Sequence, residues 1–200
     1  ETYERVIVPS ENTLRAGITS TGMPFFEVVT PRVATVVRNQ FDCQSMVGAR
    51  LENQPTNLND CFGSHLDERL FFTEAMSAVH SVGSSILSPI SLALLEDSGW
   101  YRPNYTSIAL SPFGLGAGCD FVNEDCIIDG NVPTYSKGFF CASTLSITDE
   151  EDYTGFPSCN PSHTHVAICD LADHSLNHTG LDLELQHHYF DNTVSATTIQ

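Results

Sequence analysis

The sequence has few basic residues. Only 8 of its 200 residues are Lys or Arg, against 25 Asp and Glu, which gives a formal net charge of -17 at pH 7. A chain with this charge repels phosphate backbones and anionic lipid headgroups, which argues against nucleic-acid binding and against docking on an anionic membrane. No apolar run approaches the roughly 20 residues that cross a bilayer. The sequence therefore predicts no direct membrane span.

Several motifs of catalysis and cofactor binding are also absent. The cysteines include no CxxC pair, which excludes thioredoxin-type redox centres and the usual zinc-ribbon spacing. The glycines at 114, 116 and 118 form neither a GxGxxG nor a Walker loop, and no serine lies in a G-x-S-x-G elbow. The acidic run 149–152 lacks the alternating ligand pattern of a calcium loop. Nucleotide binding, serine hydrolysis and calcium binding are all disfavoured.

The composition that remains predicts a folded chain with helices in its first part. Hydrophobic residues make up 41%, enough for one ordinary domain or two small ones. Thr30 as N-cap, a first-turn proline and apolar residues at helical spacing predict a helix over 31–41. Ser88 and the following proline begin a second predicted helix, which Gly99 ends. This second helix is apolar almost all round, so we expect it to be buried.

The composition changes along the chain. Residues 51–64 are rich in turn formers and polar side chains, which predicts a loop. After residue 118 the chain consists of Gly, Pro, Cys, Ser and Asp with short apolar runs, and such a region depends on disulfides for its stability. We therefore expect an α+β protein with a first domain over 1–118 and a cysteine-rich domain of loops and short strands over 119–200.

Cysteines and glycosylation sequons favour an exported protein. Seven cysteines without metal-binding spacing indicate a disulfide framework, and their odd number leaves a free thiol or, as we favour, a bridge to another segment. Asn104-Tyr105-Thr106 and Asn177-His178-Thr179 are N-glycosylation sequons, with Asn104 and Asn177 as acceptors. The predicted location is the cell surface or the extracellular space.

Four short segments of the sequence form one further pattern. They are Gly63-Ser64-His65-Leu66-Asp67-Glu68-Arg69, Thr73-Glu74-Ala75-Met76, Leu95-Glu96-Asp97-Ser98-Gly99-Trp100-Tyr101 and Gly118-Cys119-Asp120-Phe121. The most informative pair is the Gly-Ser-His segment followed, eleven positions after the histidine, by a methionine. Together these segments resemble the leishmanolysin and invadolysin zinc metallopeptidases, which are metzincins, and the similarity covers roughly residues 31 to 190.

The resemblance implies roles for individual residues. His65 matches the third zinc ligand of the family, and Met76 matches the Met-turn methionine, which lies beneath the metal without binding it. Without the resemblance, His65 is more simply a satisfied polar residue and Met76 a core filler. The family also implies two disulfides and leaves three cysteines unassigned. The pairs are Cys43–Cys119 and Cys141–Cys169, and the unassigned residues are Cys61, Cys126 and Cys159.

The HExxH motif of zinc peptidases is absent. None of the eight histidines is followed by glutamate. In that motif two histidines on one helix face bind zinc and the glutamate is the general base, so residues 1–200 alone should not hydrolyse peptides. Residues 1–5 also show neither an initiating methionine nor signal-peptide features. We expect an internal or processed start, with HExxH on a missing N-terminal segment or on another chain.

Two functions therefore remain, with a weaker third. The first is part of an extracellular zinc endopeptidase with protein or peptide substrates, built as the C-terminal part of a metzincin catalytic unit and a disulfide-rich domain. The second is a non-catalytic structural or adhesion glycoprotein on the same fold. The third, an unrelated disulfide-rich binding domain, requires the match to be chance. The pair His163 and His165, with four histidines downstream, is better explained as surface residues than as a metal site.

Overall fold

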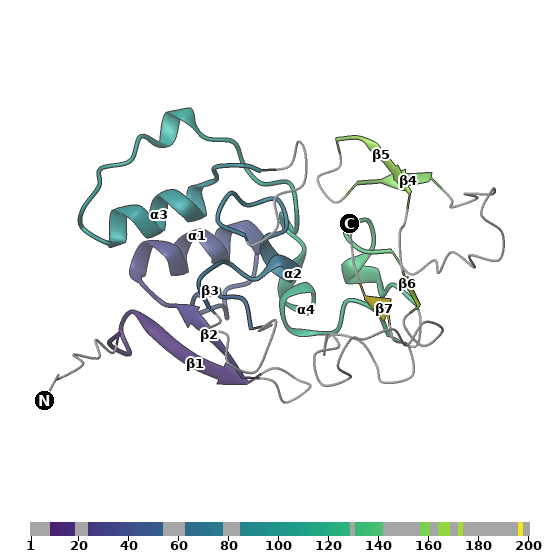
Figure 1. Cartoon of the computed structure of the whole chain (residues 1–200), viewed down its shortest axis with the longest axis horizontal. Coiled ribbons are helices and arrows are strands. Elements are labelled where there is room, and N and C mark those ends of the chain that lie inside the picture. Colours follow the sequence, from purple (N-terminus) through teal and green to yellow (C-terminus); the bar gives the residue numbers. More distant parts are fainter. Residues whose placement is uncertain are drawn as a thin grey trace, which may run out of the picture.

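The structure, a computed structural model, describes residues 9–18, 24–53, 63–77, 85–128, 131–141, 157–160, 164–168, 172–173 and 196–197. In this part of the chain helices and strands are mixed, as expected of an α+β protein. A small antiparallel sheet lies against a layer of helices, and short strand pairs from the later residues lie apart from that sheet (Figure 1).

The sheet has three strands in the order β1-β2-β3. β1 (Leu14–Ile18) pairs antiparallel with β2 (Pro24–Val28), and β3 (Ala49–Arg50) pairs antiparallel with the other edge of β2. Val28 lies opposite Leu14 on one side and Ala49 on the other, and both Val28 and Ala49 are buried. The end of β2 next to β3 therefore faces the core.

Helix α1 (Pro31–Phe41) has the predicted bounds, and Thr30 is its N-cap residue as predicted. The side chain of Thr30, however, makes no capping hydrogen bond. The backbone N–H groups of Arg32 and Val33 donate instead to one carboxylate oxygen of Asp97, at 2.9 and 3.1 Å. A carboxylate from the end of another helix thus takes the place of the local cap.

Helix α3 (Pro89–Asp97) also begins and ends near the predicted positions. The hydroxyl of Ser88 accepts the N–H of Ile90 at 3.1 Å, and Gly99, with φ 76°, follows its end. The expectation that the helix is buried all round was wrong, because Leu95 is 38% exposed. α3 lies along α1 (Figure 1), and its buried residues are the consecutive Ile90, Ser91, Leu92 and Ala93, so its N-terminal half is buried and its C-terminal half is not.

The core contains a cluster of phenylalanines. Phe41 of α1 stacks on Phe121 of α4 (Gly118–Asn123), with ring centroids 5.9 Å apart, and meets Phe71 of α2 (Glu68–Phe71) edge-on at 5.6 Å. Phe113 and Phe140 pack on the same ring of Phe121. The core therefore runs across the predicted domain boundary near 118 as far as Phe140, and the division into two domains stays a prediction.

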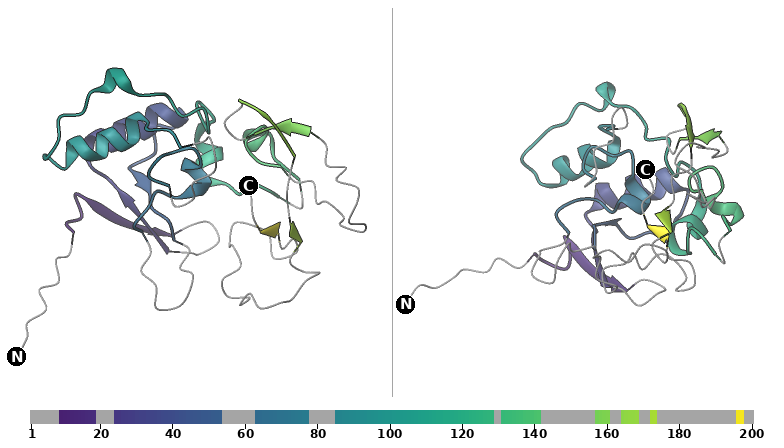
Figure 2. Two further views of the ribbon diagram at one scale, coloured as in Figure 1. Left: turned by 45° about the horizontal axis from the view of Figure 1, so that its top comes forward. Right: turned by 45° about the vertical axis from the view of Figure 1, so that its right-hand side comes forward.

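The later residues form short elements, as their composition predicts. Two 3-10 turns lie at Tyr105–Ser107 and Thr134–Ser136. β4 (Pro157–Cys159) pairs antiparallel with β5 (Val166–Ile168), and β6 (Ala172–Asp173) with β7 (Ala196–Thr197). Figure 2 shows both pairs away from the three-stranded sheet.

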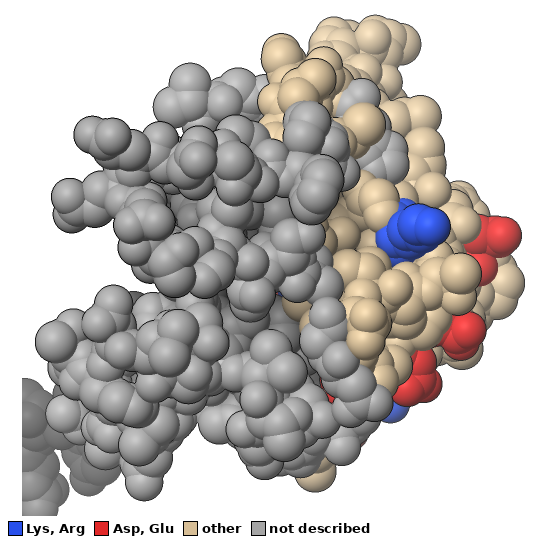
Figure 3. Space-filling model, turned by 90° about the vertical axis from the view of Figure 1, so that its right-hand side faces the viewer, with Lys and Arg blue, Asp and Glu red and all other residues tan. Residues whose placement is uncertain are grey.

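The described part of one face of the molecule carries few charged side chains (Figure 3). On the face drawn in Figure 3, acidic side chains lie along the margin of the described part, and most of the rest is uncharged. Among the described residues, no helix combines the length and apolar character that crossing a membrane requires.

Candidate functional site

The segment around position 65 lies between two other segments of backbone. Leu66 forms an antiparallel bridge with Leu51, which directly follows β3, and a parallel bridge with Ser77. The N–H of Asp67 donates to the carbonyl of Arg50 at 3.1 Å, which extends the pairing along the same edge. The three-stranded sheet is thus continued by two short segments that are distant in the sequence.

This register places His65 between Glu52 and Met76. The N–H of Glu52 donates to the carbonyl of His65 at 2.9 Å, and the N–H of Leu66 donates to the carbonyl of Met76 at 2.9 Å. Residues at matching positions of adjacent strands present their side chains on the same face. The predicted zinc ligand and the predicted Met-turn methionine are therefore neighbours in the pairing, although they belong to different segments.

The imidazole of His65 is held through one nitrogen. Its Nδ1 lies 2.9 Å from each carboxylate oxygen of Glu52. The hydroxyl and the N–H of Ser64 donate to Oε1 of the same carboxylate, at 2.8 and 3.2 Å. The His65 side chain is 47% exposed and that of Glu52 only 19%. In the described part of the chain, Nε2 of His65 has no hydrogen-bond partner.

The same contacts set the ionisation of the carboxylate. Partial burial raises the pKa of Glu52, but the hydrogen bonds from Ser64 and His65 act in the opposite direction and hold that pKa below its ordinary value. Glu52 is therefore ionised near neutral pH. An ionised carboxylate on Nδ1 favours the proton on that nitrogen and leaves the lone pair on Nε2.

The segment with Met76 is fixed by a buried glutamate. Glu74 is 2% exposed, and its carboxylate accepts hydrogen bonds from the Ser88 hydroxyl, from the Ser91 hydroxyl at 2.7 Å and from the N–H groups of Ala75 and Ser88 at 3.2 and 3.3 Å. These bonds attach the segment to the first turn of α3. Met76 itself is 41% exposed, so it does not fill the core.

The residues directly after His65 anchor the site to α4. Asp67 caps α2 by accepting the N–H of Arg69 at 3.1 Å, and burial raises the pKa of its carboxyl although Arg69 lowers it. The Arg69 guanidinium donates to the carbonyls of Val122, at 3.3 Å, and Glu124. The turn that carries His65 is therefore tied to the core on its C-terminal side.

The donor groups fit one position of a zinc site. An imidazole nitrogen is a common zinc ligand, and a carboxylate on its other nitrogen is the usual partner of such a ligand. Within the ranges that the structure describes, no group of three or more His, Cys, Asp or Glu residues could hold a metal ion. The remaining ligands would have to come from elsewhere.

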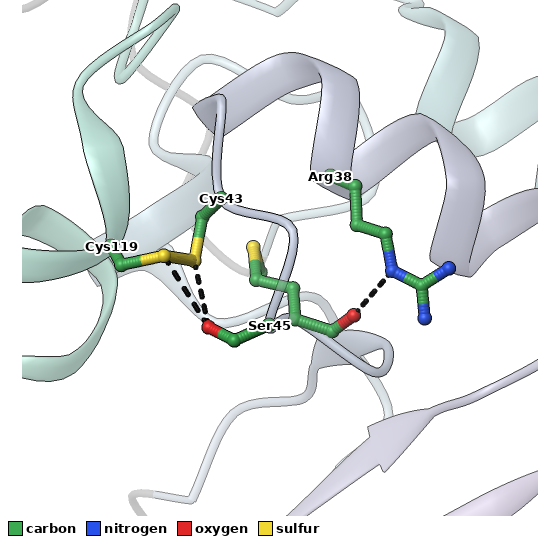
Figure 4. Close-up of a disulfide and its surroundings, with 5 residues drawn as sticks. Arg38, Cys43, Ser45 and Cys119 are labelled. Carbon is green, nitrogen blue, oxygen red and sulfur yellow. Dashed lines mark hydrogen bonds between the residues drawn. A yellow bond between two sulfur atoms is a disulfide. The ribbon is translucent and has the colours of Figure 1, made fainter.

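One predicted disulfide is fully described. Cys43 and Cys119 are joined, with Cα atoms 4.8 Å apart, and link the end of α1 to the first turn of α4. The hydroxyl of Ser45 lies 3.2 and 3.3 Å from the two sulfurs (Figure 4). Cys141 is also disulfide-bonded, and its expected partner Cys169 lies outside the described residues.

The sequence analysis assigned no disulfide partner to the other three cysteines, Cys61, Cys126 and Cys159. Cys126 is buried and Cys159 exposed, and both carry free thiols. Burial raises the pKa of the Cys126 thiol, although the positive charge of Arg69 lowers it. Cys61 lies outside the described residues.

The remaining predicted positions lie on the surface or outside the described part. Asn104 is exposed, and its side-chain oxygen accepts hydrogen bonds from the N–H and the hydroxyl of Thr106 at 3.0 and 2.7 Å. His165 is exposed, with Nδ1 2.8 Å from the hydroxyl of Thr164. Asn177 and His163 lie outside the described residues.

Two site residues were missed from the sequence, Glu52 and Glu74. Glu52 belongs to the segment predicted as a loop, and its bond to His65 joins positions thirteen apart. Glu74 bonds serines fourteen and seventeen positions away. Such contacts leave no local periodicity, so the sequence assigned no role to Glu52 or to Glu74, although Glu74 lies in the family-like segment 73–76.

Comparison with known proteins finds relatives of this chain in one family. The leishmanolysin family model (peptidase family M8) matches residues 20–196. A leishmanolysin-like peptidase of Drosophila pseudoobscura pseudoobscura is 34% identical over 147 residues, which is 74% of this chain and 21% of that protein. A leishmanolysin-like peptidase of Caenorhabditis elegans is 37% identical over 151 residues, covering 74% and 22%.

More distant relatives include leishmanolysin itself. The leishmanolysin of Leishmania donovani is 26% identical over 150 residues, covering 74% of this chain and 23% of that protein. The chain thus spans about a fifth of the length of the curated relatives it matches. The match of the family model over most of the sequence confirms the resemblance, and the chain belongs to the leishmanolysin family of metallopeptidases.

Proposed function

We propose that this chain is part of a zinc metalloendopeptidase, in which His65 is one zinc ligand and Met76 is the methionine of the Met-turn. The observation that carries the proposal is the state of the His65 ring, whose side chain is 47% exposed and held through Nδ1 by Glu52, while Nε2 has no hydrogen-bond partner within the described part. A neutral imidazole in this arrangement presents a nitrogen lone pair suited to zinc. Membership of the leishmanolysin family supports the reaction class.

The part of the chemistry that this chain supplies is limited. Zinc, when bound, supplies the Lewis acid that activates water and polarises the peptide carbonyl. His65 would hold one coordination position, and Glu74 would keep the segment with Met76 against α3. The sequence contains no HExxH, so two ligands and the general base must come from a further segment of the complete protein or from another chain. The 200 residues alone should not hydrolyse peptides.

The surroundings of this site are proposed on the same basis. Residues up to about 118 would form the C-terminal part of a metzincin catalytic unit, and those after it a disulfide-rich region. The substrates would be proteins or peptides. The Cys43–Cys119 disulfide and the exposed sequon at Asn104 support a place at the cell surface or outside the cell, where disulfides persist.

The proposal is tested by zinc content and peptide hydrolysis in the complete protein. We expect one zinc per molecule, and we expect the His65→Ala variant to lose both zinc and activity, because three protein ligands are needed for a catalytic site. The matched control is His165→Ala, which removes another exposed imidazole and should leave both unchanged. Unchanged zinc content and activity in His65→Ala would overturn the proposal.

The second candidate is a non-catalytic structural or adhesion glycoprotein built on the peptidase fold. It is favoured by the absence of a three-ligand group among the described residues, together with the missing HExxH. The same measurements separate the two functions. A complete protein that is folded, free of zinc after purification without chelators, and unable to retain added zinc would be such a scaffold.

A further inference from the structure

The contact between Glu52 and His65 is more ordered than a typical surface ion pair. Exposed pairs contribute little because two mobile side chains must be held in one geometry. Here the two residues face each other across paired backbone, with the Glu52 N–H bonded to the His65 carbonyl. The carboxylate is also fixed by two donors from Ser64. The Glu52 carboxylate is therefore held in place by contacts other than the one with the imidazole.

The geometry determines which imidazole nitrogen is available. Both oxygens of Glu52 lie 2.9 Å from Nδ1, and a carboxylate only accepts, so this nitrogen donates its hydrogen to the carboxylate. The Ser64 hydroxyl also lies 3.2 Å from Nδ1, but it donates to Oε1 of Glu52 at the shorter distance of 2.8 Å. The neutral ring then carries no hydrogen on Nε2. Free histidine favours the opposite tautomer, with the hydrogen on Nε2, which could not bind a metal through that atom. The Glu52 carboxylate thus selects the tautomer that leaves Nε2 free.

We propose that Glu52 is a positioning residue for zinc, which fixes the ring orientation and the Nδ1–H tautomer of His65 without contacting the metal. The inference rests on the proposed role of His65 as a zinc ligand. Carboxylates that act in this way increase ligand basicity, and their loss lowers metal affinity by about 10- to 100-fold. Glu52 is only 19% exposed and accepts two hydrogen bonds from Ser64, so the effect on zinc is separated from folding by Glu52→Gln, which keeps a carbonyl acceptor for these donors.

The tautomer is measured in the 200-residue chain by nitrogen-detected NMR of ring-labelled histidine. The His65 signals are assigned by their loss in His65→Ala. We expect a protonated Nδ1 and an unprotonated Nε2 in the wild type at mildly alkaline pH. Glu52→Ala should shift His65 toward the Nε2–H form, and Glu52→Gln, which keeps one carbonyl acceptor, should retain part of the wild-type form. Glu11→Gln, at an exposed site, is the matched control.

The second measurement is the zinc dissociation constant of the complete protein by chelator competition. Glu52→Gln and Glu52→Ala should weaken zinc binding by about 10- to 100-fold with an unchanged unfolding midpoint for Glu52→Gln. A wild-type His65 protonated on Nε2, or a zinc affinity that is equal in wild type and Glu52→Gln while still requiring His65, overturns the role of Glu52. Equal zinc affinity in wild type and His65→Ala overturns instead the proposed function on which that role rests.

Discussion

The carboxylate of Glu74 accepts a hydrogen bond from the hydroxyl of Ser91 at a distance of 2.7 Å, in a place where both residues are 2% exposed. Ser91 lies in the first turn of α3, and Glu74 lies two positions before Met76. A negative charge at the beginning of a helix also interacts favourably with the helix dipole. This single carboxylate therefore attaches the predicted Met-turn to the helical layer.

Replacing Glu74 by alanine should lower the stability of the protein markedly. The change leaves the buried hydroxyls of Ser88 and Ser91 and the N–H of Ser88 without an acceptor, which should cost about 3 kcal/mol of unfolding free energy. Glu74→Gln should lose less, because its carbonyl oxygen still accepts. Urea unfolding followed by circular dichroism measures both variants.

The control for Glu74 is Glu11→Ala, which removes an exposed carboxylate in a turn and should change the unfolding free energy by less than about 0.5 kcal/mol. If Glu74→Ala were as stable as this control, the hydroxyls would have other acceptors and the carboxylate would not hold the segment.

Asp97 provides a second test, since it caps a helix to which it does not belong. Its side chain is only 4% exposed and accepts the N–H groups of Arg32 and Val33 as well as an N–H of the Arg32 guanidinium at 3.1 Å. Asp97→Ala should cost about 2 kcal/mol of unfolding free energy. Asp120→Ala, at an exposed position of α4, is the matched control and should cost much less. Equal losses in the two variants would contradict the capping role.

The stabilisation by Asp97 should also depend on pH. Burial raises the pKa of its carboxyl, but hydrogen bonds from Val33 and Arg32 outweigh this and hold the pKa below the ordinary value of 3.8. A depressed pKa means that the contribution is complete above 3.8 and is lost as the pH falls below that value. The difference in unfolding free energy between wild type and Asp97→Asn should therefore shrink between about pH 5 and about pH 2.

This pH dependence must be measured as a difference between wild type and Asp97→Asn. Other buried acidic side chains change the unfolding free energy with pH in the opposite direction. Burial raises the pKa values of Glu27 and Asp67, although neighbouring arginines lower them, so their ionised forms are disfavoured in the folded state. The wild-type pH profile mixes both effects. A difference between wild type and Asp97→Asn that stayed constant down to about pH 2 would contradict the depressed pKa of Asp97.

The sequence predicted the elements that depend on neighbouring residues. The helix over 31–41 follows from a first-turn proline and apolar spacing, and the start of α3 follows from Ser88, which does cap it. The carboxylate that accepts the first N–H groups of α1 could not be predicted, since Asp97 is more than sixty positions away from them. The exposure of Leu95 was missed for a similar reason, because composition does not show which part of a helix meets a neighbour.

The residues of the candidate site also fall into those that the sequence predicted and those that it did not. His65 and Met76 were identified by resemblance to a family. The motifs of a family reflect its tertiary structure, including contacts between segments that are distant in the sequence. Glu52 has neither a motif nor a period, and its role depends on backbone pairing between segments separated by residues 54–62. Contacts formed across such a separation are set by the tertiary fold rather than by local preference.

The Cys43–Cys119 disulfide should contribute substantially to stability. It closes a sequence separation of 76 residues, for which the loss of chain entropy in the unfolded state corresponds to about 4 kcal/mol. The double variant Cys43→Ser, Cys119→Ser should therefore unfold at a much lower urea concentration. Cys159→Ser, which removes an exposed free thiol, is the control and should have no comparable effect. A double variant with wild-type stability would show that the bridge constrains little.

The sequon at Asn104 should carry an N-linked glycan when the chain passes through a secretory pathway. Asn104 is exposed, and the hydroxyl of Thr106 donates to its side-chain oxygen at 2.7 Å, so the acceptor amide and the sequon hydroxyl are already in contact. Peptide mapping after enzymatic removal of glycans should find Asn104 converted to Asp in the wild type and in Thr106→Ser. It should find unmodified Asn104 in Thr106→Ala.

The map must resolve this peptide from the one containing Asn177, the second sequon. Unmodified Asn104 in secreted wild-type protein that is otherwise glycosylated would show that this surface is covered when the sugar is transferred, because the sequon alone meets the chemical requirement.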